Sequence, residues 1–367
     1  MDAAALRASI PALERCTYLN TGSTGPSPRP VVEAVADFER RFRFEVPCEA
    51  HPYSVARDTK DSARATVAGH LGADPGEIAL TRSTTEGIAN VAAAIDWRPG
   101  DVVVRTDLEH SAGRLPWARL SDTHDVDVRV IETKNGRLDL DRLIDAVADA
   151  RLLCLSSLTW NYGTRLRVAE AVEIAHDAGA RVLVDAVQAP GQLPVDVGSW
   201  GADFVAGSGH KWLLGPWGAG FLYVDADAVG AVQPVRIGGA GTVEAEDAAY
   251  ELAPDATRFE LGTTAVAPYV GLERAIETME SVGLDAIESR IADLAARLAD
   301  GLGDRYIGPS PPESGLVSFQ TADPETTVDR LAAQGIQIRS LPHPEVCRAS
   351  VHAFNTAEEV DALLEAL

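Results

Sequence analysis

Short aliphatic and β-branched runs alternate with amphipathic segments along the first two thirds of the chain. Helix-period segments, such as residues 86–95 and 167–180, lie between several of these runs. Strand and helix in repetition predict an α/β fold with a mostly parallel sheet and helices on both faces. Functional residues are then expected beyond the carboxyl ends of the strands. The runs that predict strands are "EIALTR" (77–82), "DVVVRTD" (101–107), "RLLCLSSLT" (151–159), "RVLVDA" (181–186), "DFVAGS" (203–208) and "GAGFLYV" (218–224).

The pattern changes after residue 238. Residues 238–268 have little periodicity and many turn formers, which predicts a crossing into a second domain. A long helical stretch (266–304), short strands near 315–321 and 336–340, and an amphipathic helix over 356–367 follow, and they predict a smaller α+β domain. We therefore expect a large domain over 18–250, a small domain over 251–367, and an N-terminal segment, 1–17, that joins the small domain.

Acidic residues dominate the charge. The 367 residues include 55 Asp and Glu against 32 Lys and Arg, which gives a net charge of -23. Such a surface repels the phosphates of nucleic acid and disfavours an anionic membrane. No signal peptide and no apolar run of about 20 residues is present, so a soluble, cytoplasmic protein is expected. The acid excess also resembles that of a protein from a salt-accumulating microbe.

The charge leads to a prediction about salt. Molar KCl shortens the Debye length to about 3 Å and relieves self-repulsion among the carboxylates. The melting temperature is therefore expected to rise between dilute buffer and molar KCl. Scanning calorimetry over that range checks it, and a flat or falling melting temperature contradicts the halophilic interpretation.

Cysteine and lysine are both sparse. The four cysteines, Cys16, Cys48, Cys154 and Cys347, form no C-x-x-C pair and do not cluster with histidines, so neither a disulfide framework nor a metal site is predicted. Lysine occurs only at Lys60, Lys134 and Lys211. Lys60 and Lys134 stand in polar contexts and are expected to be replaceable, whereas Lys211 lies in a glycine-rich turn.

Candidate chemistry gathers at successive strand ends. Ser83 and Glu86 have capping-box spacing before a helix, and Thr84 and Thr85 add hydroxyls beside its free N–H groups. Such a helix end binds phosphate well, although a plain helix cap is an equally good interpretation of this motif alone.

The next two strands end in further polar groups. Asp185 closes an apolar run, so its carboxylate is expected to be buried and to need a cationic partner, and Gln188 follows three residues later. The "SGHK" turn adds Ser208, His210 and Lys211 at the same edge. A lysine in a partly dry pocket has a lowered pKa and becomes a nucleophile toward carbonyls.

An acid for a pyridinium nitrogen, a lysine for an aldehyde and several donors for a phosphate describe pyridoxal 5'-phosphate (PLP). The chain resembles the class V aminotransferase group of fold-type I PLP enzymes, which includes cysteine desulfurases, selenocysteine lyases, isopenicillin-N epimerase and C–S lyases. The resemblance rests on "YLNTGSTGP" (18–26), "TRSTTEGIAN", "DLEHSAGRLPW", "VLVDAVQAPGQLPVDV", "GADFVAGSGHKWLLGPWGAGFLYV", "RFELGTT" and "CRASVHAFNTAEEVDAL". It would explain Lys211, since arginine cannot bond covalently to the aldehyde.

The resemblance implies a role for each matching residue. Lys211 would bind the aldehyde and move the α proton, Asp185 would pair with the pyridinium, and His110 would stack on the ring unless it is an ordinary loop histidine. Gln188 would contact the ring hydroxyl. The phosphate would be held by Thr84, Thr85, Ser208 and His210, with Thr263 reaching it from the other subunit of a homodimer with shared sites. Arg348 would bind the substrate carboxylate, with Arg339 as the alternative, beside Trp160 and Gly22.

Two departures from the desulfurase pattern bear on the reaction. Desulfurases carry a persulfide-forming cysteine on a mobile loop that corresponds to the short interval between Arg339 and Arg348. Its one cysteine, Cys347, abuts Arg348 and would face the opposite side of a strand; Cys48 has no family role. Trp160 stands where desulfurases usually have asparagine.

We therefore expect a PLP enzyme that acts at the α carbon of a small L-amino acid as a C–S lyase or aminotransferase. Two alternatives stay open: a cysteine desulfurase or selenocysteine lyase with an atypical cysteine, and a catalytically silent paralogue that acts as a binding module. The presence of Lys211, Asp185 and His110 together argues against a silent paralogue.

Overall fold

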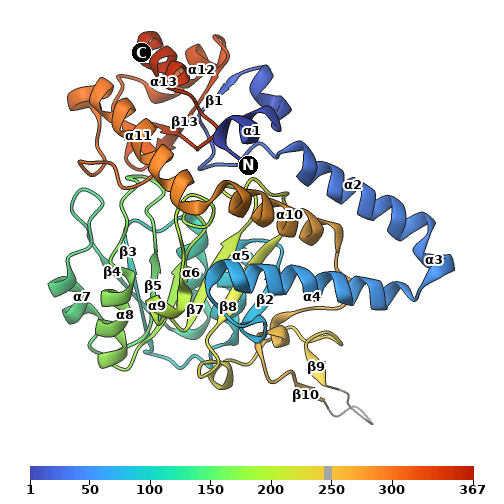
Figure 1. Ribbon diagram of the computed structural model, residues 1–367. Coiled ribbons are helices and arrows are strands. Elements are labelled where there is room, and N and C mark those ends of the chain that lie inside the picture. Colours follow the sequence, from blue (N-terminus) through green and yellow to red (C-terminus); the bar gives the residue numbers. More distant parts are fainter. Residues whose placement is uncertain (244–249) are drawn as a thin grey trace.

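A seven-stranded sheet forms the centre of the computed structural model, which describes residues 1–243 and 250–367 (Figure 1). The strand order is β2-β8-β7-β6-β5-β3-β4, and only β8 runs antiparallel to its neighbours. The mostly parallel sheet is confirmed, and the carboxyl ends of β2, β7, β6, β5 and β3 lie at one edge. The strands are β2 (Ile78–Thr81), β3 (Val102–Thr106), β4 (Asp127–Ile131), β5 (Ala150–Ser156), β6 (Arg181–Asp185), β7 (Phe204–Ser208) and β8 (Gly220–Val224).

All six expected strands are present, and β4 is an additional one. It pairs only with β3 at the edge of the sheet, and Asp127 and Val130 are exposed. Its residues, DVRVI, do alternate apolar and polar positions, so the strand pattern was present in the sequence and was missed.

Helices cover both faces of the sheet. On one face, Ile88 of α5 (Thr84–Ala94) and Trp117 of α6 (Leu115–His124) share a buried cluster with Leu152 and Phe204. On the other face, Val67 and Leu272 belong to a larger cluster with Val182 and Phe221. The helices of that face are α4 (Pro52–Leu71), α7 (Leu140–Val147), α8 (Val168–Asp177) and α10 (Ala267–Val282), and a short α9 (Val197–Trp200) follows β6.

A three-stranded antiparallel sheet of order β11-β14-β13 lies beside the large sheet, with α11, α12 and α13 around it. The expected helix over 266–304 is in fact two helices, because Gly283 between α10 and α11 adopts φ +92°, outside the helical region. The bounds are α11 (Leu284–Leu302), β11 (Leu316–Phe319), α12 (Pro324–Ala332), β13 (Arg339–Pro342), β14 (Glu345–Ser350) and α13 (Ala357–Ala366).

The N-terminal residues contact the C-terminal part of the chain. β1 (Thr17–Tyr18) pairs in parallel with β12 (Ile336–Gln337), and Arg7, in α1 (Ala3–Ala8), forms a 2.8 Å ion pair with Glu359. These contacts fit the expected role of segment 1–17, but the domain limits stay a prediction. Residues 244–249 of the expected crossing lie outside the described residues, between β9 (Thr242–Val243) and β10 (Glu251–Leu252).

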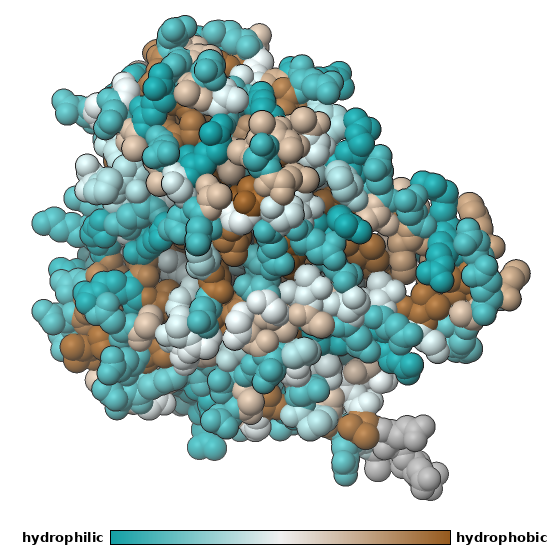
Figure 2. Space-filling view, in the orientation of Figure 1, coloured by the Kyte–Doolittle hydropathy of each residue, from teal (hydrophilic) through white to brown (hydrophobic). Residues whose placement is uncertain are grey.

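The helices α2 (Arg29–Phe44), α3 (Val46–Glu49) and α4 form an arm that projects from the body (Figure 1). Hydrophilic side chains cover much of the face in Figure 2, and apolar ones gather in smaller patches, one of them at the end of the arm. Phe44 and Tyr53 are exposed there.

Within residues 1–243 and 250–367, no helix combines the length and apolar composition that crossing a bilayer requires.

Candidate active site

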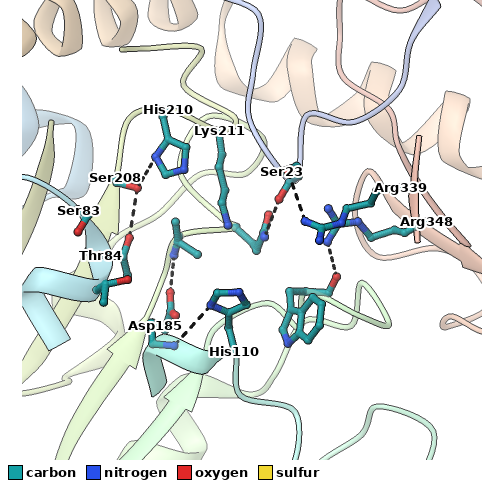
Figure 3. A pocket seen from close by; sticks show the side chains of 16 residues that line it. Ser23, Ser83, Thr84, His110, Asp185, Ser208, His210, Lys211, Arg339 and Arg348 are labelled. Atoms are coloured by element: carbon teal, nitrogen blue, oxygen red, sulfur yellow. Dashed lines mark hydrogen bonds between the residues drawn. The ribbon is translucent and has the colours of Figure 1, made fainter. Parts of the chain in front are cut away.

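A cavity lies at the carboxyl edge of the large sheet where the small sheet approaches it (Figure 3). Its convergent polar groups are typical of a cofactor site. The lining residues are Gly22, Ser23, Ser83, Thr84, Thr85, His110, Ala112, Trp160, Asp185, Val187, Gln188, Ser208, His210, Lys211, Arg339 and Arg348.

Lys211 and Asp185 form the electrostatic centre of the cavity. Asp185 ends β6 with its side chain buried, and burial raises the pKa of its carboxyl although Lys211 and the N–H of Val187, 3.0 Å from Oδ1, oppose the rise. Burial also lowers the pKa of Lys211 to about 8; Asp185 opposes this shift and two arginines add to it. More of the amine is therefore neutral near pH 7 than in an ordinary lysine, which favours a nucleophile or base.

Hydroxyl and amide donors gather at the end of the cavity formed by the start of α5 and the turn after β7. Ser83 caps α5 and accepts from Glu86 N at 3.2 Å, so the amino end of the helix faces the cavity beside Thr85. Thr84 Oγ1 contacts Ser208 Oγ at 3.3 Å, and Ser208 Oγ lies 3.0 Å from Nδ1 of His210. Free N–H groups at a helix start with hydroxyls around them bind an anion such as phosphate.

A histidine and a tryptophan form the wall between these groups and the small sheet. The ring of Trp160 meets the ring of His110 edge-on, with 5.4 Å between centroids, and its Nε1 donates to Leu108 O at 3.0 Å. Burial and nearby cations, Lys211 first, lower the pKa of His110 to about 4, so the imidazole is neutral at neutral pH. A neutral ring can lie against a cofactor face without adding charge.

Gln188 is held by both ends of its amide. Its Nε2 donates to Gly22 O at 3.1 Å, and its Oε1 accepts from Trp212 Nε1 at 2.7 Å. The second hydrogen on Nε2 stays available to a ligand.

Two arginines reach the cavity from the small sheet (Figure 3). Arg348 is 1% exposed and donates from Nη1 to Trp160 O at 2.7 Å. Arg339 donates from Nη1 to Ser23 Oγ at 3.3 Å. Gly22 leaves room for this arrangement, since a Cβ there would lie 3.1 Å from Nη2 of Arg348.

The structure brings together every residue expected at the site except Thr263. Thr263 adopts φ +58° in an exposed loop and does not line this cavity, and the resemblance places it in the site of a partner. The individual roles stay predictions. Sequence reasoning missed Ser23, although it lies in the "YLNTGSTGP" motif, and recognised Ser83 only as a cap. It also missed Ala112 and Val187, whose apolar side chains give no signal of their own.

The donor set fits PLP on chemical grounds. The cavity offers an amine of lowered pKa for the aldehyde, a buried carboxylate for the pyridinium, and a helix amino end with hydroxyls for the phosphate. Nε and Nη2 of Arg348 are buried and have no hydrogen-bond partner, as expected for groups that receive a carboxylate. No group of three or more metal-ligating side chains occurs among the described residues.

Comparison with known sequences identifies the same chemistry. The model of the aminotransferase class V family matches residues 17–363. A probable cysteine desulfurase from Methanothermobacter thermautotrophicus is 35% identical over 386 positions, which span 99% of this chain and 96% of the relative.

Solved structures with the same fold come from two kinds of enzyme. The apo cysteine desulfurase of Thermococcus onnurineus NA1 superposes with a TM-score of 0.92 at 30% identity, covering 98% of this chain and 96% of the other. The cystine C–S lyase C-DES, in complex with its product cysteine persulfide, gives 0.90 at 28% identity, covering 97% and 98%. A C-DES mutant with glycine linked to the PLP cofactor gives 0.91 at 27% identity, covering 98% of each chain.

Proposed function

The chain belongs to the class V aminotransferase family and is a PLP-dependent enzyme, and on that premise we propose that it is a C–S lyase for a small sulfur-containing L-amino acid. The observation that favours the lyase over a desulfurase is the composition of the cavity. It contains the base, the carboxylate and the arginines that such a reaction needs, and no cysteine lines it among the described residues.

The residues of the cavity would hold the cofactor at three points. Lys211 Nζ would bond to the aldehyde, Asp185 would pair with the ring nitrogen, and the start of α5 would take the phosphate. His110 would lie on the ring face and Gln188 would donate its free Nε2 hydrogen to the ring hydroxyl. When bound, PLP supplies an electron sink that stabilises negative charge at the substrate α carbon.

The same residues support elimination. Arg348 would orient the substrate carboxylate. Nζ of Lys211, released when the substrate amine takes its place at the aldehyde, would then take the proton from the α carbon. The C–S bond then breaks and the sulfur leaves with the bonding electron pair, as sulfide from cysteine or as a persulfide from a disulfide. Water converts the remaining three-carbon enamine to pyruvate and ammonia.

The orientation of Cys347 supports elimination over sulfur transfer. Its side chain points away from the cavity, and Sγ contacts Pro324 O at 3.5 Å and Thr321 Oγ1 at 3.6 Å. Burial raises the pKa of its thiol, so the thiolate that attacks substrate sulfur is disfavoured. The alternation along β14 that directs Arg348 inward directs Cys347 outward, as expected from the sequence.

The connection before Cys347 is too short for a mobile loop. β13 ends at Pro342 and β14 begins at Glu345, so only His343 and Pro344 join two paired strands. The alignment with the Methanothermobacter relative runs over 386 positions, more than the 367 residues here, so that relative has residues without a counterpart in this chain.

A cysteine desulfurase is the second candidate, because several relatives and two of the similar solved structures are named so. It would need a thiolate to accept the sulfur and would release alanine. Of the remaining cysteines, Cys154 is fully buried with a raised pKa, while Cys16 and Cys48 lie outside the cavity lining. An aminotransferase would use the same groups without breaking the C–S bond.

The cysteines provide the test between the two reactions. We expect Cys347→Ser and Cys48→Ser each to keep most of the activity, and no cysteine to carry a persulfide after incubation with L-cysteine. Intact-protein mass spectrometry with an alkylating trap measures the persulfide. A persulfide on Cys347 or Cys48, with alanine as co-product and activity abolished by serine at that position, would establish the desulfurase instead.

We also propose a homodimer in which Thr263 of each copy reaches the phosphate end of the other site. Its loop is anchored by the buried Glu260, which accepts hydrogen bonds from Lys60, from Arg64 at 2.8 Å and from Leu80 N at 3.0 Å. Light scattering of the purified protein tests the assembly.

A cytoplasmic location stays part of the proposal, since four free thiols are typical of a reducing compartment.

A further inference from the structure

Glu109 is a buried carboxyl that immediately precedes His110 in the chain. It follows β3, is 2% exposed and does not line the cavity. Its Oε1 accepts hydrogen bonds from Thr106 Oγ1 at 2.7 Å and from Ser156 N at 3.1 Å, and its Oε2 lies 2.7 Å from Ser156 Oγ. The carboxyl therefore joins the end of β3 to the end of β5, beside the turn that presents His110.

Glu109 differs from the other buried acids of the described chain, because it has no cationic partner. It forms no ion pair there, and all its hydrogen bonds come from neutral groups. A buried carboxyl without a cation is costly to ionise. By contrast, Lys211 acts on Asp185, and the remaining buried acids form ion pairs: Glu260 with Lys60 and Arg64, Asp203 with Arg181, and Glu359 with Arg7.

The carboxyl of Asp185 acts on Glu109 from the next strand. Ser156, which contacts both oxygens of Glu109, is the register partner of Asp185 on β6. Burial raises the pKa of Glu109 to about 7, and the charge of Asp185 adds to this rise. The interaction is mutual, so a negative charge on Glu109 also makes the surroundings of Asp185 more favourable to a proton.

The hydrogen bonds of Glu109 suit both of its protonation states. Thr106 Oγ1 accepts from Leu108 N at 3.2 Å, so its own hydrogen is directed to Oε1, as is the N–H of Ser156. Oε2 contacts only Ser156 Oγ, and a hydroxyl can donate to a carboxylate or accept from a protonated acid. Glu109 can therefore change its charge without losing its contacts.

Few other charges surround Glu109. Arg105 donates to Thr106 O at 2.9 Å and forms no ion pair with Glu109. The charged residues of α6 are exposed, and α5 contributes only Glu86, which pairs with arginines. The charged and titratable groups around Glu109 are Asp185 on β6, Cys154 on β5, Arg105 on β3, and His110 and Arg114 in the turn after β3.

We propose that Glu109 is a positioning residue that acts through Asp185: its carboxylate adds a second negative charge behind Asp185 and so strengthens the hold of Asp185 on the proton of the cofactor's ring nitrogen. A protonated ring nitrogen makes the ring a better electron sink. As the pH falls, a proton on Glu109 removes that charge. The inference rests on PLP dependence and is independent of which bond of the substrate breaks.

Nuclear magnetic resonance of the holoenzyme, reconstituted with PLP that carries nitrogen-15 in the ring, reports on the ring nitrogen directly. In wild type the signal should shift once between about pH 5 and 9, toward the protonated form as the pH rises, which is opposite to ordinary titration. Glu109→Gln imitates the protonated acid and should lose this step. Ser156→Ala removes a hydrogen bond that lowers the pKa of Glu109, so its step should move to higher pH.

The melting temperature of the holoenzyme provides a second measurement without turnover. Burial raises the pKa of Glu109, so the stability that Glu109 contributes is present at low pH and is lost as the pH rises through the folded value. The melting temperature of Glu109→Gln minus that of wild type should therefore increase between about pH 5 and 8. Asp185, whose pKa is also raised, is present in both proteins and cancels in the difference.

The pH dependence of turnover separates this role from a purely structural one. With L-cysteine, the loss of kcat in Glu109→Gln should be absent near pH 5 and about tenfold above pH 8, a factor that corresponds to one pKa unit. A structural role gives the same loss at every pH. A nitrogen-15 step that is absent in wild type or survives in Glu109→Gln would overturn the proposal, as would a melting difference that does not change with pH. If both pH steps occur but L-cysteine is not converted, the lyase function fails and the role of Glu109 stands.

Discussion

Replacement of Lys211 by alanine is expected to abolish both the covalent attachment of PLP and turnover while the protein still folds. Lys211 provides the amine of lowered pKa in the cavity, and the loss of a positioned general base alone costs about 10²- to 10⁴-fold in rate. Asp185 loses a nearby cation but keeps the hydrogen bond from Val187 N, so the fold is expected to persist with a lower melting temperature at most. Intact mass after borohydride reduction, visible absorbance and kcat measure the three effects.

Lys134→Ala is the matched control, since Lys134 is exposed in a turn outside the cavity. It should retain the cofactor and full activity. Lys60 is a poor control, because its Nζ pairs with the buried Glu260, so the expectation that Lys60 can be freely replaced needs revision. A Lys211→Ala variant that keeps the reducible cofactor bond would refute the assignment of Lys211.

Arg348→Met is expected to lower kcat/KM about 100-fold for every amino acid substrate. Truncating one partner of a buried, hydrogen-bonded charge pair costs about 2–5 kcal/mol, and 1.4 kcal/mol corresponds to a factor of ten. Most of the loss should be in KM, because Arg348 binds the carboxylate in the ground state as well as in the transition state. Steady-state kinetics on two or more substrates measures it.

Stability should move in the opposite direction. Arg348 is buried, lies opposite Arg339 and has no acidic partner, so methionine at this position removes a like-charge contact. The melting temperature of Arg348→Met should equal or exceed that of wild type. Arg348→Lys keeps the charge and loses the two-pronged geometry, so its kcat/KM should lie between the two. Unchanged kcat/KM in Arg348→Met would assign the α-carboxylate to Arg339 instead.

The large sheet and its site edge could be predicted because local signals coincide there. Apolar runs predict β2, β3, β5, β6, β7 and β8. The polar site residues come at the ends of these runs, as Asp185 does at the end of β6. The carboxyl ends of parallel strands lie at one edge of the sheet in any strand order, so these residues come together. Ser83, Thr84 and Thr85 were identified as a group because a capping motif is encoded within four residues.

Contacts that depend on distant register could not be predicted. The pairing of Arg339 with Arg348 requires the two-residue connection between β13 and β14, which the sequence does not mark with a typical hairpin signal. The ion pair of Lys60 with Glu260 joins residues 200 positions apart. The first contact depends on the register of a hairpin and the second on the packing of distant segments, whereas the cofactor site was apparent from local motifs.

The most direct test of the central claim is the product of the holoenzyme acting on L-cystine and L-cysteine. Elimination gives equimolar pyruvate and ammonia, with a persulfide or sulfide as the sulfur product and no requirement for an amino acceptor. Enzymatic assay of pyruvate beside chromatography for alanine measures both outcomes in one reaction. Alanine as the amino acid product with sulfur retained on a cysteine, or a ketoacid formed only when an amino acceptor is added, would contradict it.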